Sequence, residues 1–271
     1  MSNGKAHQSH LPAPPGEPPL HEPSSDQKSL RVAETFDSVQ GEGRLTGVAS
    51  HFIRLSGCNL RCWFCDTPYA SWKPEGPSQS IDQLVRRAIA SGNRHIVLTG
   101  GEPLMFAGVE RLVCQLRSAG LHVTIETAGT VAPDLLADLM SISPKLPSST
   151  PTAANTAAVP QIRDWDKASL QRWSALHEQR RWQPDVIAKL IANSVDHQIK
   201  FVIDTPADQT EVSAAVDALQ VDREQVWIMP QAITTVELDE KAKWLQPWCA
   251  AEGYQYCDRK QIRWYGNRRG T

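Results

Sequence analysis

Residues 57–65 read GCNLRCWFC, and this stretch decides how the whole chain is interpreted. The spacing C-x3-C-x2-C lets one short loop bring three sulfurs to the same side. Such a loop could hold structural zinc, which takes four protein ligands, or a [4Fe–4S] cluster, which normally takes four cysteines. No fourth cysteine or histidine lies nearby, since His51 is seven residues upstream and belongs to an expected strand. Three cysteines on a cluster would leave one iron open to a ligand from outside the protein, and three unrelated buried cysteines remain the third interpretation.

The loop follows an apolar segment that is expected to be a strand, and strands and helices alternate after it. The expected strands are 49–55, 95–98, 121–125, 199–203, 225–229 and 261–264, with a strand end at 141–143. The expected helices are 80–91, 109–119, 133–140, 164–193 with a break at Pro184, 207–219 and 236–251. Strands joined by helices of this length form parallel sheets. The pattern therefore predicts an α/β fold, an incomplete (β/α) barrel of about six parallel strands.

The unusual residues of the chain come directly after these strands. Residues 57–66 follow the first strand, 99–103 the second, 126–130 the third and 143–145 the fourth. Ligands of parallel α/β folds bind at the carboxyl ends of the strands. The sequence therefore predicts one shared site that these segments build together.

Composition excludes several classes of protein. The chain has 271 residues, with 28 Lys and Arg against 30 Asp and Glu, so it lacks the basic excess of proteins that grip nucleic acid by bulk charge. No apolar run reaches the roughly 18 residues of a membrane helix, and the N-terminus lacks the apolar core of a secretory signal. Six cysteines are too few for a disulfide scaffold, and Cys114, Cys249 and Cys257, which have no metal spacing, are interpreted as packing residues.

The chain divides into a tail and one domain. Residues 1–30 hold six of the 19 prolines and almost no aliphatic periodicity, so they are expected to be a disordered proline-rich tail. Residues 31–271 are expected to form a single catalytic domain. An insertion at about 146–181 is longer than a minimal connection, and its helix could cover the site, pack in a dimer or bind an electron donor.

The cysteine loop resembles the signature of the radical S-adenosylmethionine (SAM) superfamily. Phe64 stands where that superfamily commonly has an aromatic residue, and Thr99-Gly100-Gly101-Glu102-Pro103 resembles its GGEP motif at the end of the second strand. Glycine is needed where a backbone approaches a ligand closely. The resemblance implies a [4Fe–4S] cluster whose open iron binds SAM, and radical chemistry that begins with cleavage of SAM.

Further stretches resemble one family within that superfamily, the 7-carboxy-7-deazaguanine synthases of queuosine biosynthesis. They are ETFDSVQGEG (34–43), HFIRLSGC (51–58), CDTPYA (65–70), SPKL (143–146), KFVI (200–203) and WYGNRRGT (264–271). The resemblance covers nearly everything from residue 31 to the end. It implies a lyase that converts 6-carboxy-5,6,7,8-tetrahydropterin to 7-carboxy-7-deazaguanine by ring contraction with loss of ammonia, regenerating SAM.

The same resemblance implies the site residues. Those implied for the substrate are Val39, Gln40, Gly41, Glu42, Arg54, Thr99 and Thr271. Those implied for SAM are Phe64, Cys65, Asp66, Gly101, Ser143, Pro144 and Lys145. Those implied for metals are Cys58, Cys62 and Cys65 for the cluster and Thr67 for Mg2+. It further implies a homodimer, and an external flavodoxin-like electron donor and a cytoplasmic location are expected.

Elementary chemistry agrees with these roles but leaves simpler ones open. A backbone turn with a carboxylate can read the donors and acceptors of a pterin edge, and a guanidinium fork suits a carboxylate. Without the motif, Arg54 could be a surface charge, Thr67 a helix cap, Lys145 a solvated loop lysine and 40–43 only a tight turn. Two other functions are considered as well: an activase of a glycyl radical enzyme, and a zinc-binding module without catalysis.

Overall fold

The computed structural model describes residues 28–156, 159 and 165–271. Of the proline-rich tail expected over 1–30, residues 1–27 lie outside the described residues. The domain boundary expected at residue 31 is corrected to residue 29, because strand β1 begins at Ser29 and the Leu30 side chain is buried in the core. Leu30 pairs with the short strand β3 and therefore belongs to the folded domain.

The framework is one sheet of nine strands in the order β3-β1-β2-β4-β5-β6-β7-β8-β9. The strands are β1 (Ser29–Val39), β2 (Ala49–Leu55), β3 (Ser78–Ser80), β4 (His95–Gly100), β5 (His122–Thr127), β6 (Ala137–Ile142), β7 (Ser194–Ile203), β8 (Val226–Pro230) and β9 (Gln255–Tyr256). Every pairing from β2 to β9 is parallel, whereas β1 is antiparallel to β2 and β3. The α/β prediction of an incomplete barrel with about six parallel strands is confirmed.

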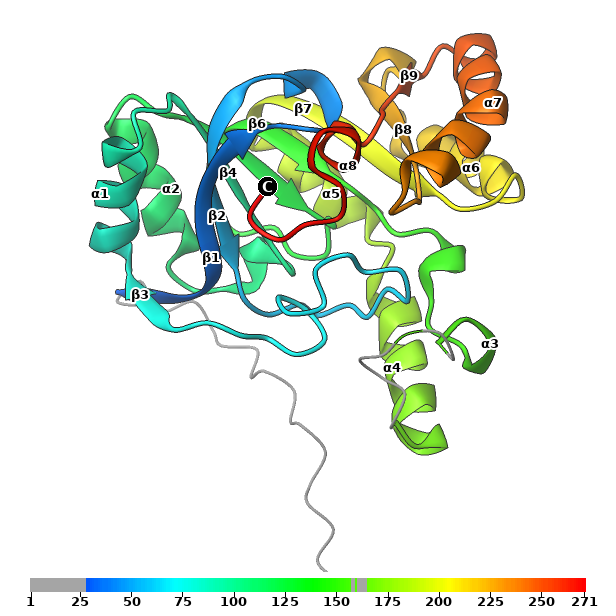
Figure 1. Ribbon diagram of the computed structural model, residues 1–271, viewed down its shortest axis with the longest axis horizontal. Coiled ribbons are helices and arrows are strands. Elements are labelled where there is room, and N and C mark those ends of the chain that lie inside the picture. The colour runs from blue at the N-terminus through cyan, green and yellow to red at the C-terminus, as the bar shows by residue number, and fades with distance from the viewer. Residues whose placement is uncertain (1–27, 157–158, 160–164) are drawn as a thin grey trace, which may run out of the picture.

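The helices connect the strands and cover the sheet (Figure 1). They are α1 (Ile81–Ala90), α2 (Val109–Ser118), α3 (Ala153–Thr156), α4 (Lys167–Arg180), α5 (Pro184–Ala192), α6 (Asp208–Leu219), α7 (Thr235–Glu252) and α8 (Lys260–Tyr265). The main core joins apolar strand residues such as Ile53 and Ile125 to helix residues such as Leu84 and Leu112. Among the described helices, none is both long and apolar enough to cross a membrane.

Two expected elements are wrong. Residues 133–140, expected to be a helix, contain the start of strand β6, and 261–264, expected to be a strand, lie in helix α8. Short apolar runs carry too few residues to separate a period of 3.6 from a buried strand. Tertiary pairing decides the first case, because β6 fills the gap between β5 and β7. The expected break near Pro184 is confirmed, since it separates α4 from α5.

Strand β1 was not among the expected strands, yet it places a key segment. It runs beside β2 in a register that pairs Glu34 with Arg54 and Val39 with Ala49. Its carboxyl end runs antiparallel to β2, and the turn that follows it, residues 40–42, reaches over to β7 and α8. Figure 1 shows the C-terminal segment, in red, curling across the centre of the same region. The first and last parts of the domain therefore meet at the carboxyl ends of the parallel strands.

Candidate active site

A cavity of about 440 Å³ opens at the carboxyl ends of the parallel strands. The predicted site residues that line it are Val39, Gln40, Gly41, Glu42, Arg54, Cys58, Cys62, Phe64, Cys65, Asp66, Thr67, Thr99, Gly101, Ser143, Lys145 and Thr271. Pro144, the remaining residue expected to contact SAM, is buried and is not among the residues that line this cavity, whereas its neighbours Ser143 and Lys145 are. The four segments that were predicted to build one shared site, 57–66, 99–103, 126–130 and 143–145, therefore all contribute residues to this cavity.

The three cysteines of the 57–65 loop face this cavity from one side. Cys58 is buried and its sulfur accepts the Leu60 N–H at 3.4 Å, while the Cys65 sulfur lies 3.0 Å from the Ser71 hydroxyl. Burial raises the pKa of the Cys58 thiol to about 12, so the thiol is neutral until it binds a metal. In the part of the chain that the structure describes, no three His, Cys, Asp or Glu side chains converge on the position of a single ion. The three thiols line the same cavity, which is the arrangement that an iron–sulfur cluster with three cysteine ligands requires.

The Thr99–Pro103 segment closes against the cysteine loop. A Cβ atom at Gly101 would lie 2.1 Å from the Gly57 carbonyl oxygen and 2.6 Å from the Cys58 Cβ. The Glu102 carboxylate accepts the N–H of Leu104 at 3.1 Å, the Thr127 hydroxyl at 2.7 Å and the Ala128 N–H at 2.8 Å. Burial raises the pKa of Glu102. Gly101 thus permits close contact between the two segments, and Glu102 ties the end of β4 to the end of β5.

We expect Gly101→Ala to destabilise the metal-free protein by about 2–3 kcal/mol, because its methyl group would overlap the Gly57 backbone. Urea unfolding measures the loss. The matched control is Gly92→Ala, where φ is +74° and nothing lies within 4 Å, so only the left-handed backbone costs energy, about 1 kcal/mol. Equal losses in the two variants would contradict the close approach at Gly101.

The turn at 40–42 packs against the C-terminal helix. The Gly41 carbonyl accepts the Lys260 N–H at 3.0 Å, and a Cβ atom on Gly41 would lie 2.7 Å from the Gln261 backbone nitrogen. The Gln40 amide donates to Glu126 Oε1 at 3.1 Å, at the end of β5. These contacts hold the backbone of the turn at the cavity wall, with only a glycine fitting at position 41.

Glu42 is the centre of a buried ionic group that the sequence did not identify. Its carboxylate accepts hydrogen bonds from Lys200 Nζ, from Arg259 Nε at 3.4 Å and from Gln261 Nε2 at 2.6 Å, and Arg259 also pairs with Asp66. Burial alone would raise the pKa of Glu42, but the charges of Lys200 and Arg259 lower it to about 2. The same attraction raises the pKa of Lys200 despite its burial. Glu42 therefore stays ionised inside the protein.

A signal for Lys200 was present in the sequence. It stands within the apolar strand segment IKFVI (199–203), and a lysine inside a strand buried on both faces needs an anionic partner. Arg259 and Gln261 also line the cavity and were not predicted, whereas Glu126, which lines it too, belongs to the 126–130 segment that was expected to help build the site. Arg259 and Gln261 lie more than 200 residues from Glu42, so no local pattern links them.

Stability should depend on pH through Glu42. Its pKa is depressed in the folded state, so its contribution is present above its ordinary pKa of 4.5 and is lost as pH falls toward about 2. The shift corresponds to a contribution on the order of 3 kcal/mol. We therefore expect Glu42→Gln to be less stable than the wild type at pH 7, and the gap to narrow as pH falls to 3, in urea unfolding of the metal-free protein.

The control for that comparison is Glu240→Gln, which removes an exposed pair with Lys243 and should change stability little at any pH. A gap between wild type and Glu42→Gln that stays constant from pH 7 to pH 3 would show that the ionised Glu42 carboxylate contributes nothing to folding.

Arg54 lies on β2 with part of its guanidinium free for a ligand. Its Nε donates to Glu34 Oε1 at 2.8 Å, and the Tyr69 hydroxyl donates to the same oxygen at 2.7 Å. The bond from Nε to Glu34 is the one hydrogen bond that the Arg54 guanidinium makes to a described residue. The two terminal nitrogens of Arg54 therefore remain available to a ligand in the cavity. Arg269 pairs with Glu34 at 3.2 Å and its guanidinium lies 3.9 Å from the Tyr69 ring centroid. Arg269 thereby holds the C-terminal segment over the cavity.

The remaining predicted residues have distinct surroundings. The Thr67 hydroxyl lies 3.8 Å from the Cys65 sulfur, and a turn rather than a helix follows it, so the helix-cap interpretation is not supported. Lys145 Nζ donates to the carbonyl of Ser143 at 2.6 Å and to its hydroxyl at 2.7 Å, which holds it in the cavity wall. Phe64 packs edge-on against Trp63 with centroids 5.3 Å apart.

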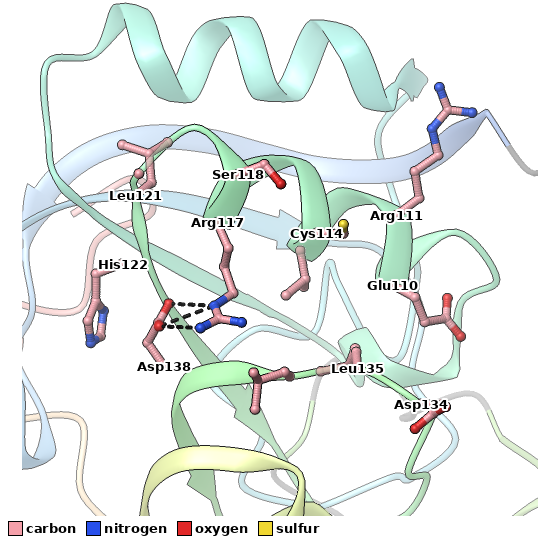
Figure 2. Close-up of a pocket in the computed structure, with 13 residues that line it drawn as sticks. Glu110, Arg111, Cys114, Arg117, Ser118, Leu121, His122, Asp134, Leu135 and Asp138 are labelled. Carbon is pink, nitrogen blue, oxygen red and sulfur yellow. Dashed lines mark hydrogen bonds and ion pairs between the residues drawn. The ribbon is translucent and has the colours of Figure 1, made fainter.

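A second, more open cavity lies on the outer surface between α2 and the segment that leads into β6 (Figure 2). The Arg117 guanidinium and the Asp138 carboxylate form a two-pronged ion pair there, at 3.0 and 3.1 Å. Cys114 faces this cavity and is exposed, so its interpretation as a packing residue is wrong. None of the predicted site residues lines this cavity.

Comparison with known proteins identifies relatives of this chain by sequence and by fold. The sequence profile of the Radical SAM superfamily matches residues 52–178. A 7-carboxy-7-deazaguanine synthase from Rhodopirellula baltica is 50% identical over 247 residues, covering 91% of both chains, and one from Halobacterium salinarum is 37% identical, covering 88% of this chain and 91% of its own. The crystal structure of QueE from Escherichia coli covers 86% of this chain and 94% of its own, with a TM-score of 0.59 at 20% identity, and so shares the fold.

Proposed function

The chain belongs to the 7-carboxy-7-deazaguanine synthase family of the radical SAM superfamily, and on that premise we propose that its cavity converts 6-carboxy-5,6,7,8-tetrahydropterin to 7-carboxy-7-deazaguanine. The enzyme is a lyase of queuosine biosynthesis. One observation carries the proposal: the thiols of the 57–65 loop and the turn at 39–42 line the same cavity. A glycyl-radical activase would give that turn and Arg54 no purpose, and the relatives do not favour it.

The family implies a [4Fe–4S] cluster and SAM. The thiols of Cys58, Cys62 and Cys65 line one cavity, which suits a cluster held by three cysteines. When bound, the cluster and SAM supply a carbon-centred radical that removes a hydrogen atom from the substrate. The protein contributes binding, orientation and shielding from water.

We assign the SAM contacts to Phe64, Cys65, Asp66, Gly101, Ser143 and Lys145. Gly101 lines the cavity, where its backbone can contact a ligand, and its missing side chain lets the segment pack against Gly57 of the cysteine loop. The Lys145 ammonium, held by Ser143, offers a cation to a carboxylate. The Phe64 ring, placed on the cavity wall, offers an apolar face to an adenine ring.

The pterin is proposed to lie between the 39–42 turn and Arg54. The Val39, Gln40 and Gly41 backbone can pair with the donors and acceptors of a pterin edge, and the ionised Glu42 accepts from its N–H groups. The free nitrogens of Arg54 suit the substrate carboxylate. Thr99, at the end of β4, and Thr271, at the C-terminus, complete the proposed substrate contacts.

We also propose a Mg2+ site at Thr67. Thr67 lines the cavity, and its hydroxyl lies 3.8 Å from the Cys65 sulfur. Mg2+ keeps several waters and binds one or two protein oxygens together with those of a substrate, so a single threonine ligand is sufficient.

Three further proposals concern the surroundings of the enzyme. An external flavodoxin-like protein supplies the electron, the chain forms a homodimer, and it works in the cytoplasm. Resemblance to the family supports the homodimer, and an oxygen-sensitive cluster with a nucleoside-precursor substrate supports the other two.

The decisive experiment is anaerobic incubation of the reconstituted protein with SAM, a reductant and 6-carboxy-5,6,7,8-tetrahydropterin. We expect a product with the mass of 7-carboxy-7-deazaguanine. Omission of Mg2+ should lower the rate if Thr67 binds the metal, and Thr67→Ala should reduce that dependence. A protein that carries iron and sulfide and cleaves SAM yet releases no deazaguanine would refute the proposed substrate.

A further inference from the structure

Residues 147–149 and helix α4, which are described parts of the 146–181 segment, pack against the loop that carries the three cysteines. His177 on α4 is buried, and its Nδ1 accepts the backbone N–H of Arg61 at 3.1 Å. Its other nitrogen, Nε2, lies 2.8 Å from the Ser149 hydroxyl, which in turn donates to the Leu146 carbonyl at 2.7 Å. Burial lowers the pKa of His177 to about 4, so the ring is neutral and its Nε2 carries the proton.

Two more contacts join the segment to the same loop. The Trp63 indole donates to the Ser148 carbonyl at 2.8 Å, and Arg180 donates to the Asn59 carbonyl at 3.3 Å. Figure 1 shows α4 at the lower right, apart from the helices α1 and α2 that lie against the sheet. The segment therefore supports the cysteine loop from outside.

The side chain that this arrangement encloses is Arg61. It is 6% exposed, and its guanidinium carbon lies 3.9 Å from the ring centroid of Trp173 on α4 and 5.9 Å from that of Trp72. Its Nη1 donates to the carbonyls of Cys58 and Leu60, at 2.8 and 2.7 Å. Among the described residues Arg61 makes no ion pair with a carboxylate, and its buried Nε has no hydrogen-bond partner.

A buried arginine is costly unless something offsets its charge. Two aromatic faces and two carbonyls stabilise it in part. Two of the thiols that would become negatively charged when a cluster binds belong to close neighbours of Arg61: Cys62 directly follows it, and Cys58, three residues before it, accepts from its Nη1 through the carbonyl at 2.8 Å. Arginine remains protonated in proteins, so this site holds a permanent cation beside the three thiols.

We propose that Arg61, packed against Trp173 of α4, is a positioning residue whose fixed charge raises the reduction potential of the bound cluster. The inference rests on the proposed cluster at the three cysteines. Reduction adds one electron from an external donor, and so one negative charge, to that cluster. A nearby cation in a low-dielectric interior stabilises the reduced form more than the oxidised form, and net charge near a cluster is one determinant of its potential.

The test compares two substitutions in the full reconstituted protein. Arg61→Gln removes the charge but keeps amide donors for the carbonyls, whereas Arg61→Lys keeps the charge but loses the planar fork. The midpoint potential is measured by anaerobic titration with dithionite and mediators, following the EPR signal of the reduced cluster. We expect a more negative midpoint potential in Arg61→Gln and a value near wild type in Arg61→Lys. The control Lys167→Gln removes an exposed cation from α4 and should leave the midpoint potential unchanged.

Each outcome decides between the alternatives. An unchanged potential in Arg61→Gln at wild-type iron content overturns the inference, and so does equal loss of iron from both Arg61 variants, which would make Arg61 purely structural. Failure of the wild-type protein itself to bind iron and sulfide would instead refute the proposed function.

Discussion

Cys62→Ala is expected to abolish both cluster uptake and turnover. Its thiol lines the cavity with those of Cys58 and Cys65, and the substitution leaves a cluster held by three thiolates with only two of them. Iron and sulfide content, absorbance near 400 nm and deazaguanine formation measure the loss. Activity should fall below detection.

Cys114→Ala is the matched control, because this cysteine is exposed in the outer cavity and outside the proposed site. It should keep full cluster content and full activity. A Cys62→Ala protein that still bound iron and sulfide at the wild-type level would remove the basis for the cluster, and with it the proposed chemistry.

Arg54→Ala is expected to weaken substrate binding by about 10²-fold, because it removes a charge-assisted, two-pronged hydrogen bond to the substrate carboxylate. Cluster content should stay unchanged, since Arg54 does not touch the cysteine loop. Glu34 keeps Tyr69 and Arg269 as partners, so the cavity wall should remain folded. The loss should appear mainly in KM, and calorimetric titration with the pterin gives the affinity directly.

Arg54→Lys should recover part of the affinity, because it keeps the charge but not the fork. Arg223→Ala is the control, as it removes an exposed arginine paired with Glu252 far along the chain. Unchanged pterin affinity in Arg54→Ala would refute the assigned role of this residue.

Local pattern was enough for most of the framework. The strand at 49–55 and the helix at 80–91 were predicted to within a residue at their ends, because apolar spacing and the Ser80–Gln83 capping box are encoded in neighbouring residues. Segment 133–140 was mistaken for a helix because its few apolar residues fit both periods. Its place between β5 and β7 depends on residues far away in the chain.

The site residues divide in the same way, into those that local pattern indicated and those that only distant parts of the chain place. A loop of nine residues carries all three cysteines, so their spacing alone indicated a metal centre, and their position after a strand indicated where it lies. The buried partners of Glu42 could not be predicted in this way. Lys200, Arg259 and Gln261 reach it from β7 and the C-terminal part of the chain, and only the closing of the sheet brings them together.

The amino-acid sequence by itself determined the alternation of strands and helices, the cysteine loop and the family to which both point, because each is written in short-range spacing. Tertiary structure alone decided that Glu42 is paired with two cations and that Arg61 packs against α4 behind the cysteine loop. The physical reason is that burial and charge pairing depend on segments brought together across long loops, whereas local pattern records only the immediate neighbours of each residue.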